Sequence, residues 1–164
     1  METTKNRTIA PSIRVRDMQK SLEFYTKTLG FQATDTLKRK DGRIVHASVG
    51  FDSPLLMLSP VEDVQSAQSK ENLTTNKLGV GVEFHIGMND TKKIDQFFTE
   101  VKSRGIKILN EPKTEFWGKR NFTVNDPDGY AITFSEHVSD ITPEAFTAAY
   151  EAAHSVTHTP PKIM

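Results

Sequence analysis

Hydrophobic and polar residues along this chain follow one pattern twice. Residues 8–31 (TIAPSIRVRDMQKSLEFYTKTLGF) read as an apolar strand, an Asp, an amphipathic helix and a closing Leu-Gly-Phe. Residues 79–106 (GVGVEFHIGMNDTKKIDQFFTEVKSRGI) repeat this order, with Asp90 in the place of Asp17. A unit repeated within a short chain indicates that neither copy buries its core alone. We therefore expect two sheets that meet, with a functional site between them.

The first unit is predicted to be β-α-β-β-β. Asp17 is expected to cap its helix. The apolar face of this helix recurs at helical spacing, at Met18, Leu22, Tyr25 and Leu29. Strands are predicted over 31–38 and 44–49, on either side of an Asp41-Gly42 hairpin signal, and a third strand over 55–58.

The second unit is predicted to repeat this order, with strands over 80–88, 106–110, 119–125 and 130–135. Its helix is expected to be capped by Asp90, and a loop through Glu111-Pro112 to follow its second strand. The sequence Asp126-Pro127-Asp128-Gly129 is interpreted as turn chemistry, because Pro presets φ and Gly accepts a positive φ. A third helix is predicted over 142–153, with Phe146 and Tyr150 forming one apolar stripe.

The predicted fold class is therefore α+β, with one domain over residues 1–136. Within it, unit one covers 8–59, unit two covers 79–136, and a polar linker without aromatic residues covers 60–78. Residues 137–164 are expected to hold the C-terminal helix and a disordered tail.

Composition narrows the function classes. Lys and Arg number 21 and Asp and Glu also number 21, so no positive field favours nucleic acid or an anionic membrane. No apolar run is long enough to span a membrane, and the start of the sequence has no apolar signal-peptide core. Because Cys is absent, disulfides, thiolate nucleophiles and Cys-based metal sites are excluded. We expect a cytoplasmic protein.

Three segments carry a family resemblance: VRDMQKSLEFYTKTLGF, GVEFHIGMND and WGKRNFTVNDPDGYAITF. Through them, residues 8–136 resemble the vicinal-oxygen-chelate superfamily of glyoxalases, extradiol dioxygenases and bleomycin-resistance proteins. The Trp-Gly-x-Arg stretch and Pro11 are most similar to the bleomycin-resistance branch. The resemblance implies that two tandem β-α-β-β-β units form a cupped mixed sheet. It also implies a homodimer, since members of that branch often complete their cups by exchanging units.

The same resemblance implies four metal-ligand positions on the floor of the cup, filled in the metalloenzymes by His, Glu or Gln. Matched motif by motif, these positions hold Ala10, Met57, Glu83 and Thr133. Only Glu83 is a competent ligand for a hard divalent ion, since Ala10 has no donor and Met57 suits soft copper. We therefore expect the family's usual metal site to be missing.

Strand alternation indicates further side chains that face the cup. Arg14 shares a face with Ala10, and it matches a position where glyoxalase relatives bind a substrate anion; the alternatives are a salt bridge or an Arg on the rim of the cup. Glu83 and His85 also share a face. They are interpreted as a proton-transfer couple, as ligands of an unconventional metal site together with His46, or as a hydrogen-bonded polar pair. The sequence leaves open whether His46 faces the cup or solvent.

Trp117 is the only Trp, and the resemblance places it at the mouth of the cavity, where an indole stacks on a planar ligand. The alternative is a loop anchor packed on the core. Arg120 is expected to pair with an acid and stabilise a turn or a dimer.

These residues favour a metal-independent protein that sequesters a planar or anionic small molecule in its cup. The cup would be lined by Arg14, His46, Met57, Glu83, His85, Trp117 and Thr133. One alternative is a glyoxalase-like lyase, isomerase or dioxygenase with a divalent metal at Glu83 and His85. Another is a dimeric interaction module whose cup is plugged by the helix that carries Phe146 and Tyr150. Whether the protein is an enzyme stays open, and no cofactor is expected under the favoured interpretation.

Overall fold

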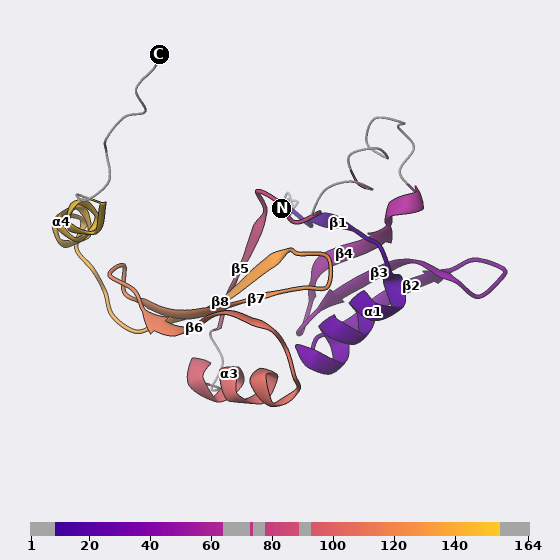
Figure 1. Cartoon of the computed structure of the whole chain (residues 1–164), viewed down its shortest axis with the longest axis horizontal. Coiled ribbons are helices and arrows are strands. Elements are labelled where there is room, and N and C mark those ends of the chain that lie inside the picture. The colour runs from indigo at the N-terminus through magenta and orange to yellow at the C-terminus, as the bar shows by residue number, and fades with distance from the viewer. Residues whose placement is uncertain (1–8, 64–72, 74–77, 89–92, 155–164) are drawn as a thin grey trace, which may run out of the picture.

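The protein is built from two four-stranded mixed sheets, each carrying its own helix (Figure 1). The structure is a computed structural model, and it describes residues 9–63, 73, 78–88 and 93–154. The predicted α+β class with two tandem β-α-β-β-β units and an added C-terminal helix is confirmed.

The first sheet has the strand order β1-β4-β3-β2. Its strands are β1 (Ser12–Val15), β2 (Gln32–Lys38), β3 (Ile44–Gly50) and β4 (Pro54–Pro60). β1 and β4 run parallel, and the other pairs are antiparallel. The second sheet repeats this topology as β5-β8-β7-β6, with β5 parallel to β8. Its strands are β5 (Glu83–Gly87), β6 (Ile108–Thr114), β7 (Lys119–Asn125) and β8 (Ala131–His137).

The helix of the first unit follows the predicted pattern. It begins as α1 (Met18–Glu23) and continues as a π-helix, η1 (Phe24–Thr28). The Asp17 carboxylate accepts a 3.0 Å hydrogen bond from the Lys20 backbone N–H, as expected of an N-cap. Gly30 follows with a φ of +79°, the left-handed conformation that ends many helices.

The helix of the second unit, α3 (Ile94–Ser103), begins later than predicted. Its N-cap is Lys93, so the prediction that Asp90 caps it is wrong; Asp90 itself lies outside the described residues. The cap comes instead from β8. Glu136 Oε2 accepts a 3.0 Å hydrogen bond from the Ile94 backbone N–H, and Glu136 Oε1 lies 2.7 Å from Lys93 Nζ.

Three strand boundaries also differ from the sequence prediction. The predicted loop at Glu111-Pro112 is wrong, because β6 continues through both residues. β6 is the edge strand, and its register shifts between Asn110 and Lys113, so Pro112 need not donate to a neighbour. β5 begins only at Glu83, and β1 begins only at Ser12, which leaves Ala10 ahead of the strand and exposed.

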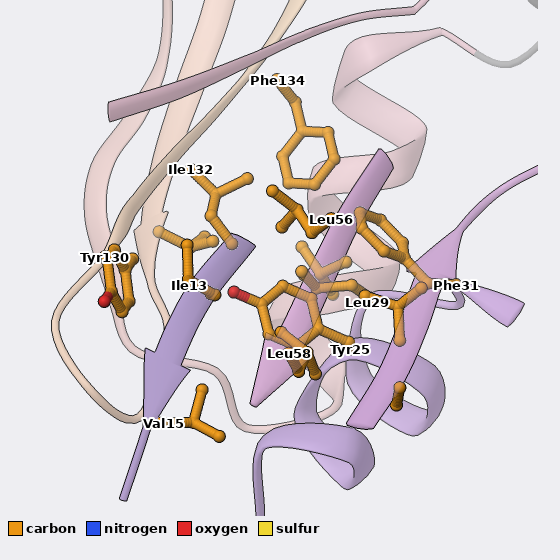
Figure 2. Packing of buried hydrophobic residues seen from close by; sticks show 14 of the residues in the cluster. Ile13, Val15, Tyr25, Leu29, Phe31, Leu56, Leu58, Tyr130, Ile132 and Phe134 are labelled. Atoms are coloured by element: carbon orange, nitrogen blue, oxygen red, sulfur yellow. The ribbon is translucent and has the colours of Figure 1, made fainter. Parts of the chain in front are cut away.

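One hydrophobic core serves both sheets (Figure 2). It joins alternate residues of the first sheet with alternate residues of the second and with the buried face of the first helix. Figure 2 shows Ile13 of β1 beside Ile132 of β8, and Tyr25 near Leu58 and Leu29. Each such side chain stabilises the fold by roughly 1.5–3 kcal/mol on burial. The remaining residues of each strand point away from this core, so each sheet keeps a second, outer face.

Polar contacts also join the two units. The Tyr25 hydroxyl donates a 3.0 Å hydrogen bond to Asp126 Oδ2, and Arg16 pairs with Asp128 at 3.2 Å. The Tyr130 hydroxyl donates a 3.1 Å hydrogen bond to the backbone carbonyl of Arg14. The turn at 126–129 is closed by its own backbone bonds, as the turn interpretation predicts. It also holds unit two against unit one.

The C-terminal helix, α4 (Pro143–His154), stands away from both sheets (Figure 1). It buries none of its residues, and its aromatic face meets Phe116, whose ring centroid lies 5.5 Å from that of Phe146. Most of the predicted linker and the predicted disordered tail lie outside the described residues. Within the described ranges, every helix is too short or too polar to cross a membrane.

Candidate functional site

The outer face of the second sheet presents a row of polar side chains. Thr133 lies between buried Ile132 and Phe134 in β8, so alternation turns it away from the core. The register places His85 of β5 on one side of it and Thr123 of β7 on the other. The row therefore runs across three strands.

A chain of hydrogen bonds fixes this row. The Thr133 hydroxyl donates to Glu83 Oε1 at 2.5 Å, and the Thr123 hydroxyl lies 2.7 Å from that of Thr133. Since the Thr133 proton goes to Glu83, Thr123 is the donor to Thr133. His85 Nε2 lies 3.4 Å from the same Glu83 oxygen. Both Thr side chains are buried, whereas Glu83 and His85 are exposed. The Glu83 carboxylate is thus held by the buried Thr133 hydroxyl and remains accessible to solvent, which suits contact with a ligand.

The outer face of the first sheet carries His46 and Met57. Ser48 lies opposite Met57 in the register, and His46 Nε2 lies 3.5 Å from the Ser48 hydroxyl. His46 is half-buried and shares this outer face with Met57. Ser12 lies opposite Met57 on the other side.

Arg14 lies on this same outer face, between buried Ile13 and Val15. It is half-buried, and its register partner is Ser59. Within the described residues the guanidinium has no acidic partner, so the salt bridge considered from the sequence is not formed there. A guanidinium in this position is free to bind a carboxylate or phosphate bidentately.

The structure brings the candidates together in two groups rather than one. Among the described residues, no hydrogen bond or ion pair joins Arg14, His46 or Met57 to Glu83, His85 or Thr133. The two outer faces approach each other at one edge, where His85 and Leu55 line a hollow of about 270 Å³. Leu55 shares its face of β4 with Met57.

The family's four ligand positions do not fit a hard divalent metal. Ala10 offers no donor and precedes β1, and Met57 offers a thioether on the other sheet. The Thr133 hydroxyl already donates to Glu83, which is the only carboxylate of the set. Within the described residues, no three His, Asp or Glu side chains converge as a metal centre would require.

Trp117 lies in the turn between β6 and β7, with 39% of its surface exposed. Its ring meets that of Phe116 edge-on, with centroids 4.8 Å apart, and it is not part of the core. Arg120 pairs with Asp95 of α3 at 2.7 Å, so the expectation that it pairs with an acid is confirmed.

Sequence reasoning missed Thr123, Lys119 and His137, which share the outer face with Thr133. A signal for them existed. The turn at 126–129 joins β7 to β8 and sets Asn125 opposite Ala131, so counting outward by pairs places Thr123 opposite Thr133 and Lys119 opposite His137.

Comparison with known proteins identifies the family. The model of the Glyoxalase/Bleomycin resistance protein/Dioxygenase superfamily matches residues 7–134. The chain belongs to this superfamily. The resemblance noted in the sequence is thereby confirmed, and the repeated β-α-β-β-β topology agrees with it.

Curated members of the superfamily with similar sequences fall into more than one functional class. A bleomycin resistance protein of Geobacillus stearothermophilus is 26% identical over 138 residues, covering 78% of this chain and 95% of that protein. A "Probable lactoylglutathione lyase" of Synechocystis sp. is 30% identical over 125 residues, covering 73% of this chain and 87% of that protein.

Solved structures support the fold. A glyoxalase/bleomycin resistance protein/dioxygenase from Nocardioides aligns with a TM-score of 0.64 at 21% identity, covering 87% of this chain and 91% of that one. The antibiotic-binding protein TnmS3 from Streptomyces sp. CB03234 aligns with a TM-score of 0.58 at 21% identity, covering 83% and 99%.

Proposed function

We propose that this protein is a metal-independent small-molecule-binding protein of the bleomycin-resistance type, acting in the cytoplasm. It would sequester a planar or anionic ligand between the outer faces of its sheets. The proposal rests on the side chains at the four positions where the family's metalloenzymes bind their metal. The four family positions supply one carboxylate, Glu83, and that carboxylate accepts a hydrogen bond from the Thr133 hydroxyl.

The side chains around this carboxylate suit binding more than chemistry. Arg14 presents a guanidinium without an acidic partner in the described chain, which favours an anionic group. Met57 adds a polarisable apolar surface, and Thr133 and Thr123 hold Glu83 in one orientation. A few fixed polar groups beside apolar surface are typical of ligand sites.

A homodimer is part of this proposal. In one chain, Arg14 and Met57 lie on one sheet, and Glu83 and Thr133 on the other, without direct contact among the described residues. A second copy that sets its first sheet against the second sheet of its partner would complete a cup in a two-fold arrangement. Light scattering of the full chain tests this, because a monomer at micromolar concentration contradicts it.

The ligand is tested by titration of the full chain in the presence of a chelator. Bleomycin, suggested by the G. stearothermophilus relative, and a panel of planar carboxylates and phosphates serve as probes, with Trp117 fluorescence as the readout. A probe that binds wild type, and binds Arg14→Met at least about tenfold more weakly, supports the proposal. Lys107→Met, which removes an exposed lysine ahead of β6, is the matched control. Binding that occurs without the chelator and is lost when the chelator is added contradicts the proposal.

One observation favours a second function. His85 Nε2 lies 3.4 Å from Glu83 Oε1, and a relative 30% identical to the chain is named a probable lactoylglutathione lyase. A glyoxalase-like lyase or isomerase would use this couple for proton transfer or as two ligands of a divalent metal. Formation of S-lactoylglutathione by the metal-supplemented protein, abolished by Glu83→Gln and by His85→Ala, would establish that function instead.

A further inference from the structure

A groove of about 910 Å³ lies between α4 and the turn that joins β6 to β7. Its walls are rich in aromatic side chains that the core does not use: Phe116, Trp117, Phe146 and Tyr150. Trp117, Phe146 and Tyr150 keep 39%, 42% and 49% of their surface exposed. Several large rings left open side by side mark a binding surface rather than a packing defect. We refer to this feature as the aromatic groove.

The aromatic groove continues the polar outer face of the second sheet. Lys119 of β7 and His137 of β8 are register partners at the end of their strands, and both line the groove. Alternation places Lys119 on the same face as Thr123, and His137 on the same face as Thr133. A ligand that contacts the Glu83 carboxylate therefore has a continuous path along this face into the groove.

α4 presents a stack of aromatic rings. The rings of Phe146 and Tyr150 lie at 16° to each other, and those of Tyr150 and His154 at 25° with centroids 4.1 Å apart. These residues are spaced four apart, so they line one side of the helix. A row of stacked rings offers a planar aromatic group apolar contact and edge-to-face packing.

The charges at the groove favour an anion. Lys119 lines the groove and has no acidic partner among the described residues. Asp140 is the one acidic residue that lines the described groove, and it lies 3.0 Å from His137 Nε2. Lys119 is therefore the cation available to a ligand.

The turn that carries Trp117 is held in place. The Gly118 carbonyl accepts hydrogen bonds from the backbone N–H groups of Val138 and Ser139, at 3.0 and 3.2 Å. Gly118 has a φ of +79°, and a Cβ there would lie 2.0 Å from the Ser139 carbonyl oxygen. The segment that leads to α4 is thus hydrogen-bonded to the turn, so the same contacts position both walls of the groove.

We propose that the aromatic groove binds a planar aromatic group bearing a negative charge, and that α4 forms one wall of this subsite. The inference rests on the proposed function in that the groove takes the aromatic part of the ligand whose polar part meets the outer faces. The stacked rings, a Lys119 without an acidic partner among the described residues, and the continuity with Thr133 fit such a group better than they fit a protein surface.

The test uses the full-length protein and two dyes that share one ring system. 8-Anilinonaphthalene-1-sulfonate is the anionic probe, and N-phenyl-1-naphthylamine lacks only the sulfonate. Because Trp117 is the only Trp, energy transfer from Trp to dye reports binding beside it. We expect one dye per chain, with sensitised emission that is lost in Trp117→Phe while direct dye fluorescence remains.

Two variants separate the contributions of stacking and charge. Tyr150→Ala should weaken the binding of both dyes about tenfold, because it removes an aromatic ring from the groove. Lys119→Met should weaken the binding of the sulfonate dye about three- to fivefold and leave the binding of the neutral dye unchanged. Lys107→Met should change the binding of neither dye, since Lys107 does not line the groove.

Three results would overturn the inference. One is the absence of sensitised emission in wild type, and another is an equal weakening of the binding of both dyes in Lys119→Met. The third is a dimer that blocks the dyes and that Tyr150→Ala converts to a monomer, which would make the groove an interface between copies. A different result would contradict the proposed function alone. In that result Arg14→Met binds every probe of the titration as tightly as wild type does, while the dyes still bind the groove.

Discussion

The Tyr25 hydroxyl donates a 3.0 Å hydrogen bond to the carboxylate of Asp126, which lies 101 residues further along the chain, and both side chains are buried. Asp126 Oδ1 also accepts from the backbone N–H groups of Asp128 and Tyr130. A single carboxylate therefore closes the turn of one unit and binds the helix of the other.

Tyr25→Phe should lower the free energy of unfolding by about 1–3 kcal/mol, because it leaves a buried carboxylate oxygen without its donor. Urea unfolding of Tyr25→Phe, Asp126→Ala and the double variant measures the coupling. Tyr150→Phe, at an exposed tyrosine, is the control and should change stability little. Strict additivity of the two single changes would show that the bond contributes nothing.

Burial raises the pKa of Asp126 above its ordinary value of 3.8. A raised folded-state pKa gives a contribution to stability that is complete below 3.8 and is lost as pH rises through the folded pKa. Wild type should therefore lose stability relative to Asp126→Asn as pH rises above about 4. Denaturant unfolding across this range measures the difference.

Asp95 provides the opposite control, because its hydrogen bonds with Arg120 lower the pKa of its carboxyl. Its contribution to stability is present above 3.8 and is lost as pH falls through the folded pKa. The difference between wild type and Asp95→Asn should thus shrink on acidification. The same sign of pH dependence for both variants would contradict the burial of Asp126.

Glu136→Ala should destabilise the protein by about 0.5–2 kcal/mol, the range for loss of a helix cap. The Ile94 backbone N–H and Lys93 hold the pKa of Glu136 below its ordinary value of 4.5. Its contribution is therefore present above 4.5 and lost as pH falls, so the cost of Glu136→Ala should diminish in acid. Glu144→Ala, on exposed α4, should cost much less at every pH.

Gly118→Ala should destabilise the protein more than Gly105→Ala, although both glycines have a φ of +79°. A Cβ at Gly118 meets the Ser139 carbonyl oxygen, whereas a Cβ at Gly105 meets nothing within 4 Å. The difference between the two variants isolates the clash from the backbone strain. Thermal unfolding and the emission maximum of Trp117 measure it, and equal effects would contradict the close approach.

The sequence predicted the fold well because its two periodicities are strong. The apolar face of the first helix, the Asp17 cap and the turn at 126–129 are all local signals, and the structure confirms each of them. The failures at Asp90 and Pro112 have nonlocal causes. The cap of α3 comes from Glu136, 42 residues beyond Ile94, and Pro112 is tolerated only because β6 is an edge strand.

The candidate site was less predictable, since it depends on register and on which sheet faces which. Alternation alone placed Glu83 and His85 on one face, but it did not reveal that Thr133 donates to Glu83. The aromatic groove depends on where α4 lies relative to Phe116, and periodicity within α4 carries no such information. The roles of Arg14, His46, Met57 and Trp117 stay predictions.

Metal binding by the full-length protein tests the central claim most directly. The protein, purified without chelator, is measured for metal content and then heated with Mn²⁺, Fe²⁺, Ni²⁺, Zn²⁺ or Mg²⁺. An ion at about 100-fold above its Kd for a native site would stabilise the fold by about 2.7 kcal/mol, a clear rise in Tm. We predict no bound metal and no rise in Tm. Stoichiometric metal that is lost in Glu83→Gln or His85→Ala would contradict the account and identify a metalloenzyme.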